Sequence, residues 1–169
     1  MKAELCQFCL KSGILCSKCR RKLEKGEVSN TDLEVSKLLV SLEDKYPALQ
    51  EIFFHKAITE NDVLAIIVGK GDVAKMLSSG GKIVKIIGKK MKKTVRIIEH
   101  NSNERKLLED LFAPICVLTI NKIWLPDGTM ETRVILKKRG SRRFSGNINS
   151  FKEIARKVFG TVLRIEFTQ

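Results

Sequence analysis

The chain has 169 residues, of which 43% are hydrophobic and 30% are charged, and its 32 lysines and arginines exceed its 19 acidic residues by 13. This length allows one ordinary domain or two or three small ones, and the apolar fraction excludes a wholly disordered basic tail. No run of roughly 18 apolar residues predicts a membrane span, and the first residues lack the apolar stretch of a secretory signal. We therefore expect a soluble, cytoplasmic protein with a positive field, which favours nucleic acid as a partner first and an acidic membrane surface second. Proteins from hot environments are also rich in lysine, but that enrichment is normally balanced by glutamate, and the basic excess of this chain is not.

Four of the five cysteines lie in the first nineteen residues, at Cys6, Cys9, Cys16 and Cys19. The two-residue spacing within each pair lets both thiolates face one tetrahedral site, as in zinc ribbons and knuckles. Disulfides are disfavoured in a reducing cell interior. A redox C-x-x-C motif needs only one pair and a βαβ context, and neither condition is met here. We expect residues 1–26 to form a knuckle around a single structural Zn²⁺ ion, whose binding supplies the folding energy. The basic residues that flank the cysteines make the knuckle positive, so it could touch phosphate or dock on the next domain.

The remaining cysteine, Cys116, lies in an apolar run and is predicted to be a buried core thiol. His55 and His100 have no ligand-like partner in the sequence, and we interpret both as ordinary polar positions.

A short linker over 26–30 leads into a first unit, 27–100, with the predicted order α-β-β-α-α-β. The apolar spacing and the turn residues give these elements. They are a helix from a Thr31–Glu34 capping box to Tyr46-Pro47, strands over 51–58 and 63–68 with a turn at 59–61 between them, helices over 72–77 and 82–91, and a strand over 94–99.

A second unit, 101–169, largely repeats this order, and each unit of about 70 residues is near the low end for independent domains. The expected elements are a helix over 103–111, strands over 116–124 and 131–137 joined by a Pro126-Asp127-Gly128 turn, a helix from Asn149 or Ser150 to Gly160, and a strand over 162–167. The predicted fold class is thus α+β, with two tandem small units after the knuckle.

The stretch from Ile67 to Ile87 resembles a KH domain of the prokaryotic type, type II, which has the α-β-β-α-α-β order. In that family a G-x-x-G turn between two helices clamps the backbone of about four nucleotides. Glycine lets phosphate approach closely, and the following helix N-terminus offers free N–H groups. Here the turn consists of Ser78, Ser79, Gly80 and Gly81, so the first glycine is replaced by serine and the last is kept.

Nine basic residues against one acid lie between Lys70 and Arg96, around this turn. Lys82, Lys85 and Lys89 share one helical face. A solvated face is the alternative, because exposed lysines are common. The residues that the resemblance and the charge assign to RNA binding in this unit are Lys70, Lys75, Ser78, Ser79, Gly80, Gly81, Lys82, Lys85 and Lys89.

The second unit resembles a KH domain more weakly, because its counterpart turn, Ser145 to Ile148, has neither clamp glycine in place. The run that contains Arg139, Arg142 and Arg143 has no acids and could hold phosphate non-specifically or extend the first surface. A purely structural repeat is the alternative.

Two tandem KH-like units on a short chain resemble archaeal NusA-like proteins, relatives of the KH part of the bacterial transcription factor NusA, over roughly residues 31–169. The resemblance implies binding of single-stranded RNA in transcription elongation or termination, with RNA polymerase as a further partner. A ribosome-associated or ribosome-assembly protein would use the same surface, and an adaptor could bind protein there instead. The sequence has no placeable nucleophile–base pair, deaminase signature or Walker A frame, so we expect neither catalysis nor a small-molecule substrate.

Overall fold

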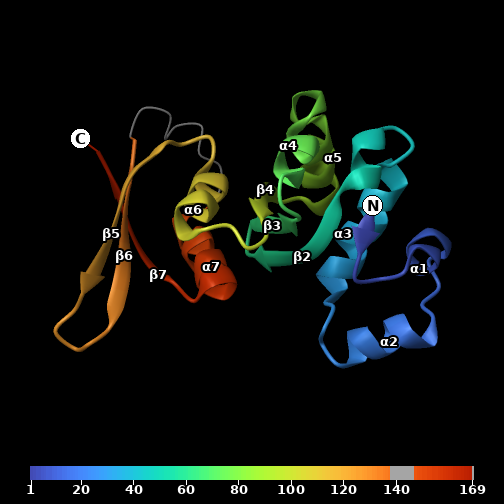
Figure 1. Ribbon diagram of the computed structural model, residues 1–169, viewed down its shortest axis with the longest axis horizontal. Coiled ribbons are helices and arrows are strands. Elements are labelled where there is room, and N and C mark those ends of the chain that lie inside the picture. Colours follow the sequence, from blue (N-terminus) through green and yellow to red (C-terminus); the bar gives the residue numbers. More distant parts are fainter. Residues whose placement is uncertain (138–146, 169) are drawn as a thin grey trace.

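The computed structural model describes residues 1–137 and 147–168. It contains two sheets with the helices α6 and α7 between them (Figure 1). The strands are β1 (Lys2–Ala3), β2 (Phe53–Glu60), β3 (Val63–Val68), β4 (Thr94–Glu99), β5 (Val117–Trp124), β6 (Met130–Leu136) and β7 (Val162–Phe167). The helices are α1 (Gln7–Ser12), α2 (Ser17–Glu24), α3 (Asn30–Leu42), α4 (Asp72–Leu77), α5 (Lys82–Met91), α6 (Glu104–Phe112) and α7 (Ile148–Phe159), with short 3₁₀ helices η1 (Pro47–Glu51) and η2 (Ser79–Gly81). Within these described ranges, no helix is long and apolar enough to cross a membrane.

The two sheets share one strand arrangement. Sheet A has the order β1-β2-β3-β4, in which β2 and β3 are antiparallel and β3 and β4 are parallel. Sheet B has the order β5-β6-β7, with an antiparallel pair followed by a parallel pair. From α3 to β4 the chain follows the expected α-β-β-α-α-β order, and the predicted bounds of β3, α4, α5, β4 and β7 are confirmed.

The central strand β3 is buried along its whole length, because both faces of sheet A are covered. Its side chains alternate between two hydrophobic cores. Leu64, Ile66 and Val68 pack with α3, α4, α5 and the cysteine-containing segment. Val63, Ala65 and Ile67 pack instead with α6, α7 and the inner face of sheet B. This alternation follows from the period of two along a strand, and it joins the two units through one sheet.

The start of α3 differs from the predicted capping box at Thr31 and Glu34. Ser29 is the N-cap, and its hydroxyl accepts a hydrogen bond from the Asp32 N–H at 3.0 Å, while Asp32 accepts one from the Ser29 N–H at 2.7 Å. The other Asp32 oxygen accepts from the backbone N–H of Ala57 in β2 at 2.5 Å. Asp32 therefore caps the helix and ties it to sheet A, a role that Glu34 on the exposed side of α3 does not have.

Three other predictions need correction. The strand expected over 51–58 begins at Phe53 and continues to Glu60, because Pro47–Glu51 forms a 3₁₀ helix and the turn lies at 61–62. Cys116 is exposed, because its side chain points away from the core that buries its neighbours Ile115 and Val117. The helix α7 has Asn147 as its cap, because Ser150 is buried and its hydroxyl contacts Asp62 across the two units.

Candidate metal centre and nucleic-acid interface

The four N-terminal cysteines predicted as ligands come together at the starts of two short helices. Cys6 and Cys16 occupy the N-cap positions of α1 and α2, and Cys9 and Cys19 follow three residues later. One helical turn brings each pair onto one side, and the four Sγ atoms all lie within 4.8 Å of one another. The Cys6 Sγ lies 3.2 Å from the Cys9 Sγ and 3.7 Å from the Cys19 Sγ.

These distances fit a tetrahedral metal ion. With metal–sulfur bonds of about 2.3 Å, the sulfurs of a tetrahedral site are about 3.8 Å apart. Backbone N–H groups support the sulfurs: that of Cys16 donates to the Cys9 Sγ at 3.1 Å, and that of Cys6 donates to the Cys19 Sγ at 3.5 Å. The cluster could therefore hold a metal ion with four sulfur ligands, which leaves no position for a reactive water.

The thiols influence one another strongly. A hydrogen bond from the Cys19 backbone, followed by one with the Cys9 thiol, lowers the pKa of Cys16 to about 6. The Cys16 backbone N–H lowers the pKa of Cys9, but the Cys6 thiol and burial outweigh it and raise that pKa to about 12. Four adjacent thiolates repel one another, and a cation among them relieves that repulsion.

The predicted clamp turn, Ser78 to Gly81, joins α4 to α5 in a left-handed conformation. Ser79, Gly80 and Gly81 have φ values of 60°, 63° and 73°. A Cβ atom added at Gly80 or Gly81 would meet nothing within 4 Å, so the turn is open on the side where those side chains would stand. Ser78 has a negative φ, and its hydroxyl donates to the Lys75 carbonyl at 2.6 Å, which ties it back to α4.

The lysines assigned to this surface separate into two groups. Lys70, Lys82, Lys85 and Lys89 are exposed, and within the described residues none of them pairs with a carboxylate. Lys75 instead lies 3.1 Å from the Asp72 carboxylate and 3.5 Å from that of Glu51. The hydrogen bond with Asp72 raises the pKa of Lys75. In the first group, Lys82 and Lys85 lie in the first turn of α5, next to the Ser78–Gly81 turn, whereas Lys70 precedes α4 and Lys89 lies about two helical turns further along α5. The charge of Lys75 is already partnered.

Two further basic residues near this turn contribute to the fold. The Lys93 ammonium donates to the Asn61 carbonyl. Arg96 donates to the carbonyls of Leu111 and Val95 at 3.1 Å each, and its guanidinium lies 5.3 Å from the centre of the Phe151 ring. Burial lowers the pKa of Arg96. The positive run in the sequence therefore overstates the charge that faces solvent.

An apolar groove runs beside the turn. It has a volume of about 220 Å³. Its apolar lining comes from α4, α5 and β4, and the end of α6 closes one side through Ala113 and Pro114. The α4 side chain nearest the turn, Leu77, is 50% exposed. We call this space the α4–α5 groove; its apolar lining residues are Val73, Leu77, Val84, Val95 and Ile97.

The second predicted basic cluster lies mostly outside the described residues, which exclude Arg139, Arg142 and Arg143 as well as the first two residues of the Ser145–Ile148 turn. Lys137, which precedes the run, is exposed.

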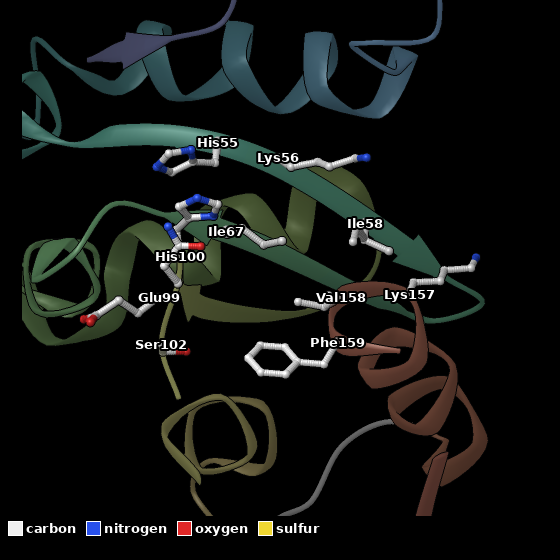
Figure 2. Close-up of a pocket in the computed structure, with 11 residues that line it drawn as sticks. His55, Lys56, Ile58, Ile67, Glu99, His100, Ser102, Lys157, Val158 and Phe159 are labelled. Atoms are coloured by element: carbon white, nitrogen blue, oxygen red, sulfur yellow. The ribbon is translucent and has the colours of Figure 1, made fainter. Parts of the chain in front are cut away.

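A larger pocket, of about 680 Å³, was not predicted from the sequence. It lies between sheet A and the end of α7 (Figure 2). Both histidines line it, with ring centres 3.9 Å apart and planes 18° from parallel. Burial, and then the charge of His100, lower the pKa of His55. No sequence signal indicates this site, because the two histidines are 45 positions apart and meet only when sheet A forms.

Comparison with known proteins gives a partial match. No protein-family model matches the sequence. Over 68 residues the chain is 34% identical to a Methanocaldococcus jannaschii protein described as a probable transcription termination protein NusA. The aligned part is 40% of this chain, and the chain spans only 36% of the length of that relative. Among solved structures, the crystal structure of APE1850 aligns with a TM-score of 0.49 and 15% identity, over 78% of this chain and 96% of that chain.

Proposed function

We propose that this protein binds single-stranded RNA at the Ser78–Gly81 turn and in the adjoining α4–α5 groove, as a NusA-like factor in transcription elongation or termination. The observation that carries the proposal is an open left-handed turn, bordered by unpaired lysines and an apolar groove. The partial likeness to a probable termination protein NusA supports the same direction. We further infer that the protein acts by binding and not by catalysis.

The turn would hold the sugar–phosphate backbone. Gly80 and Gly81 have no side chains, so a phosphate can approach their backbone closely. The backbone N–H of Lys82 already donates to the Ser79 carbonyl. The N–H groups that follow it in the first turn of α5 have no carbonyl partner within the helix and can donate to an anion. Lys82 and Lys85 would then neutralise neighbouring phosphates. This arrangement corresponds to the G-x-x-G clamp of KH domains, with Ser78 in place of the first glycine and its hydroxyl already engaged by Lys75.

The bases would lie in the α4–α5 groove. Its walls are mostly aliphatic, with Arg96 and Asp110 as the charged residues that line it. Bases would therefore be held by van der Waals contact and by hydrogen bonds at their edges more than by aromatic stacking. Leu77 and Val84 would contact them first, because they lie in the helices that flank the turn. This mode suits flexible single strands, whose bases can turn away from the backbone.

We also propose that the cysteine cluster binds one structural zinc ion. Zinc favours tetrahedral thiolate sites of this spacing. The ion would fix α1 and α2 against α3, since Cys9 and Cys19 already belong to the core on that side of sheet A. The exposed cations of this segment, among them Lys18 and Arg21, would then extend the positive surface.

The test is RNA affinity, measured by fluorescence anisotropy with a short labelled single-stranded RNA. Gly81→Asp places a carboxylate at the turn, and we expect at least a tenfold loss of affinity. Gly128→Asp is the matched control, because Gly128 also has positive φ and open space at its Cβ but lies in the β5–β6 turn. If both variants bind RNA as the unchanged protein does, the clamp is wrong.

Salt dependence tests the phosphate contacts separately. Four contacts to a single strand predict a slope of about −3 in log affinity against log salt concentration. Affinity should therefore fall about fifty-fold between 50 and 200 mM salt. A nearly flat dependence would favour a protein partner at this surface. Co-purification with RNA polymerase would support the transcription role, whereas co-sedimentation with ribosomal subunits would point to the ribosome.

A further inference from the structure

The pocket of about 680 Å³ lies apart from the turn and the α4–α5 groove, on the opposite face of sheet A. Its volume is in the range of small-molecule sites. One wall comes from β2 and from the end of β4, and the other comes from the last turn of α7. The site is thus completed only when the second unit packs on the first.

The pocket presents flat aromatic surfaces. His55 and His100 stack with ring centres 3.9 Å apart, and the Phe53 ring lies 4.4 Å from that of His55, tilted by 37°. Opposite them, Phe159 projects from the end of α7 toward Ser102 (Figure 2) and is 39% exposed. Two nearly parallel imidazole rings direct their nitrogen lone pairs along parallel planes, so they do not converge on a metal ion. A planar ring is the ligand that such walls fit.

Polar groups border the same space. The hydroxyl of Ser102 is buried and, within the described residues, has no hydrogen-bond partner. Lys56 is exposed and forms no ion pair in the described part of the chain, and it extends toward the same side as Lys157 (Figure 2). Lys157 is held there by Glu60. A ligand with a polar ring edge and a negative group would satisfy the Ser102 hydroxyl at one end and the Lys56 ammonium at the other.

We propose that this pocket binds a nucleobase with its attached phosphate. The base would lie against His100 and Phe159, its polar edge would reach Ser102, and its phosphate would face Lys56. Stacking on aromatic side chains is tolerant of base identity. The ligand is either a free nucleotide or one nucleotide of a bound RNA. This site is separate from the proposed clamp and does not depend on it.

The chain has only two histidines, and both line this pocket, so their ring resonances in a ¹H–¹³C spectrum report on it alone. The probes are adenosine and uridine 5′-monophosphate, and a short single-stranded RNA. Ribose 5-phosphate is the control that lacks a base. We expect a nucleotide or the RNA to shift both histidine signals saturably, while ribose 5-phosphate leaves them unchanged. A shift by the monophosphates assigns the site to free nucleotides, and a shift by RNA alone assigns it to RNA.

Variants complete the test. Phe159→Ala should weaken the nucleotide affinity, read from the saturation of the histidine shifts, about fivefold or more. Trp124→Ala is the matched control, because Trp124 is 72% exposed and lies outside the pocket. Gly81→Asp should leave the monophosphate-induced shift intact, so this site can succeed or fail independently of the clamp. The proposal is overturned if neither nucleotide nor RNA moves the histidine signals, if ribose 5-phosphate moves them equally, or if Phe159→Ala has no effect.

Discussion

The central strands of the two sheets, β3 and β6, hold the same place in the same strand arrangement but have different surroundings. All six residues of β3 are buried, whereas burial alternates along β6. The reason is that sheet A has helices on both faces, while α6 and α7 cover one face of sheet B (Figure 1). A repeated strand arrangement therefore does not imply equal roles. Sheet A, in the first unit, lies between two layers of helices. Sheet B, in the second unit, packs against α6 and α7 on one face.

The same difference separates their functional features. The first unit carries the open turn, the α4–α5 groove and the unpaired lysines. The second unit contributes α6 and α7. The end of α6 closes one side of the α4–α5 groove, and the end of α7 forms one wall of the pocket that contains His55 and His100. The second unit thus supports the surfaces of the first, and the following predictions measure how far that dependence extends.

Removal of the proposed zinc ion should cause the largest loss of stability. Structural zinc contributes on the order of 10 kcal/mol in small zinc-dependent segments. Chelation, or Cys19→Ser, should therefore unfold residues 1–26 and expose the side of α3 that packs on α1. Amide hydrogen exchange measures this loss, together with a zinc content that falls from one ion per chain to none. Sheet B should keep its protection, and equal loss of protection in both sheets would contradict the layered arrangement.

Phe151→Ala should destabilise both units, although Phe151 belongs to α7. Its ring is fully buried, lies 5.9 Å from that of Phe112 and faces the Arg96 guanidinium. We expect a loss of about 3–5 kcal/mol in the free energy of unfolding. Urea denaturation gives the total, and hydrogen exchange at Ala65 shows whether β3 loses protection with it. Unchanged protection at β3 would mean that the units unfold independently.

Loss of a helix-capping side chain should cost more stability in the first unit than in the second. Asp32 and Asn103 both accept a backbone hydrogen bond at the start of a helix, but Asp32 is buried and also accepts from Ala57 in β2. Asp32→Ala leaves a buried N–H without a partner, so we expect a loss of about 2–3 kcal/mol. Asn103→Ala removes an exposed cap, so about 1 kcal/mol is expected. Thermal or urea denaturation of the two variants gives the ranking, and equal losses would contradict it.

A drop in pH should cause the smallest loss of stability. It should act on the first unit, which contains both histidines. The pKa of His55 is lowered from its ordinary value of 6.5 in the fold by burial and by His100. The unfolded chain therefore binds this proton more readily, so stability falls as pH drops below about 6.5. His55→Gln should reduce that dependence between pH 7 and pH 5, measured as a shift in the urea midpoint. An identical slope in the variant would assign the dependence to other groups.

The sequence predicts the segment from β3 to β4 well, because its signals are local. An unbroken apolar run gives β3, and the glycines of the turn separate two short helices. The four cysteines are likewise found from spacing alone. What the sequence does not indicate depends on contacts between distant residues: the second covered face of sheet A, the binding of Arg96 to α6, and the meeting of His55 with His100. The Ser29–Asp32 cap has the same local spacing as the predicted Thr31–Glu34 cap. What distinguishes the two is the link between Asp32 and Ala57, which exists only in the folded sheet.

The central claim is that RNA binds the first unit, and amide chemical-shift mapping with a short single-stranded RNA tests it most directly. We expect the largest shifts on residues 77–85 and along the α4–α5 groove. We expect small shifts along β5 and β6. The largest shifts on sheet B, with none at the Ser78–Gly81 turn, would contradict it.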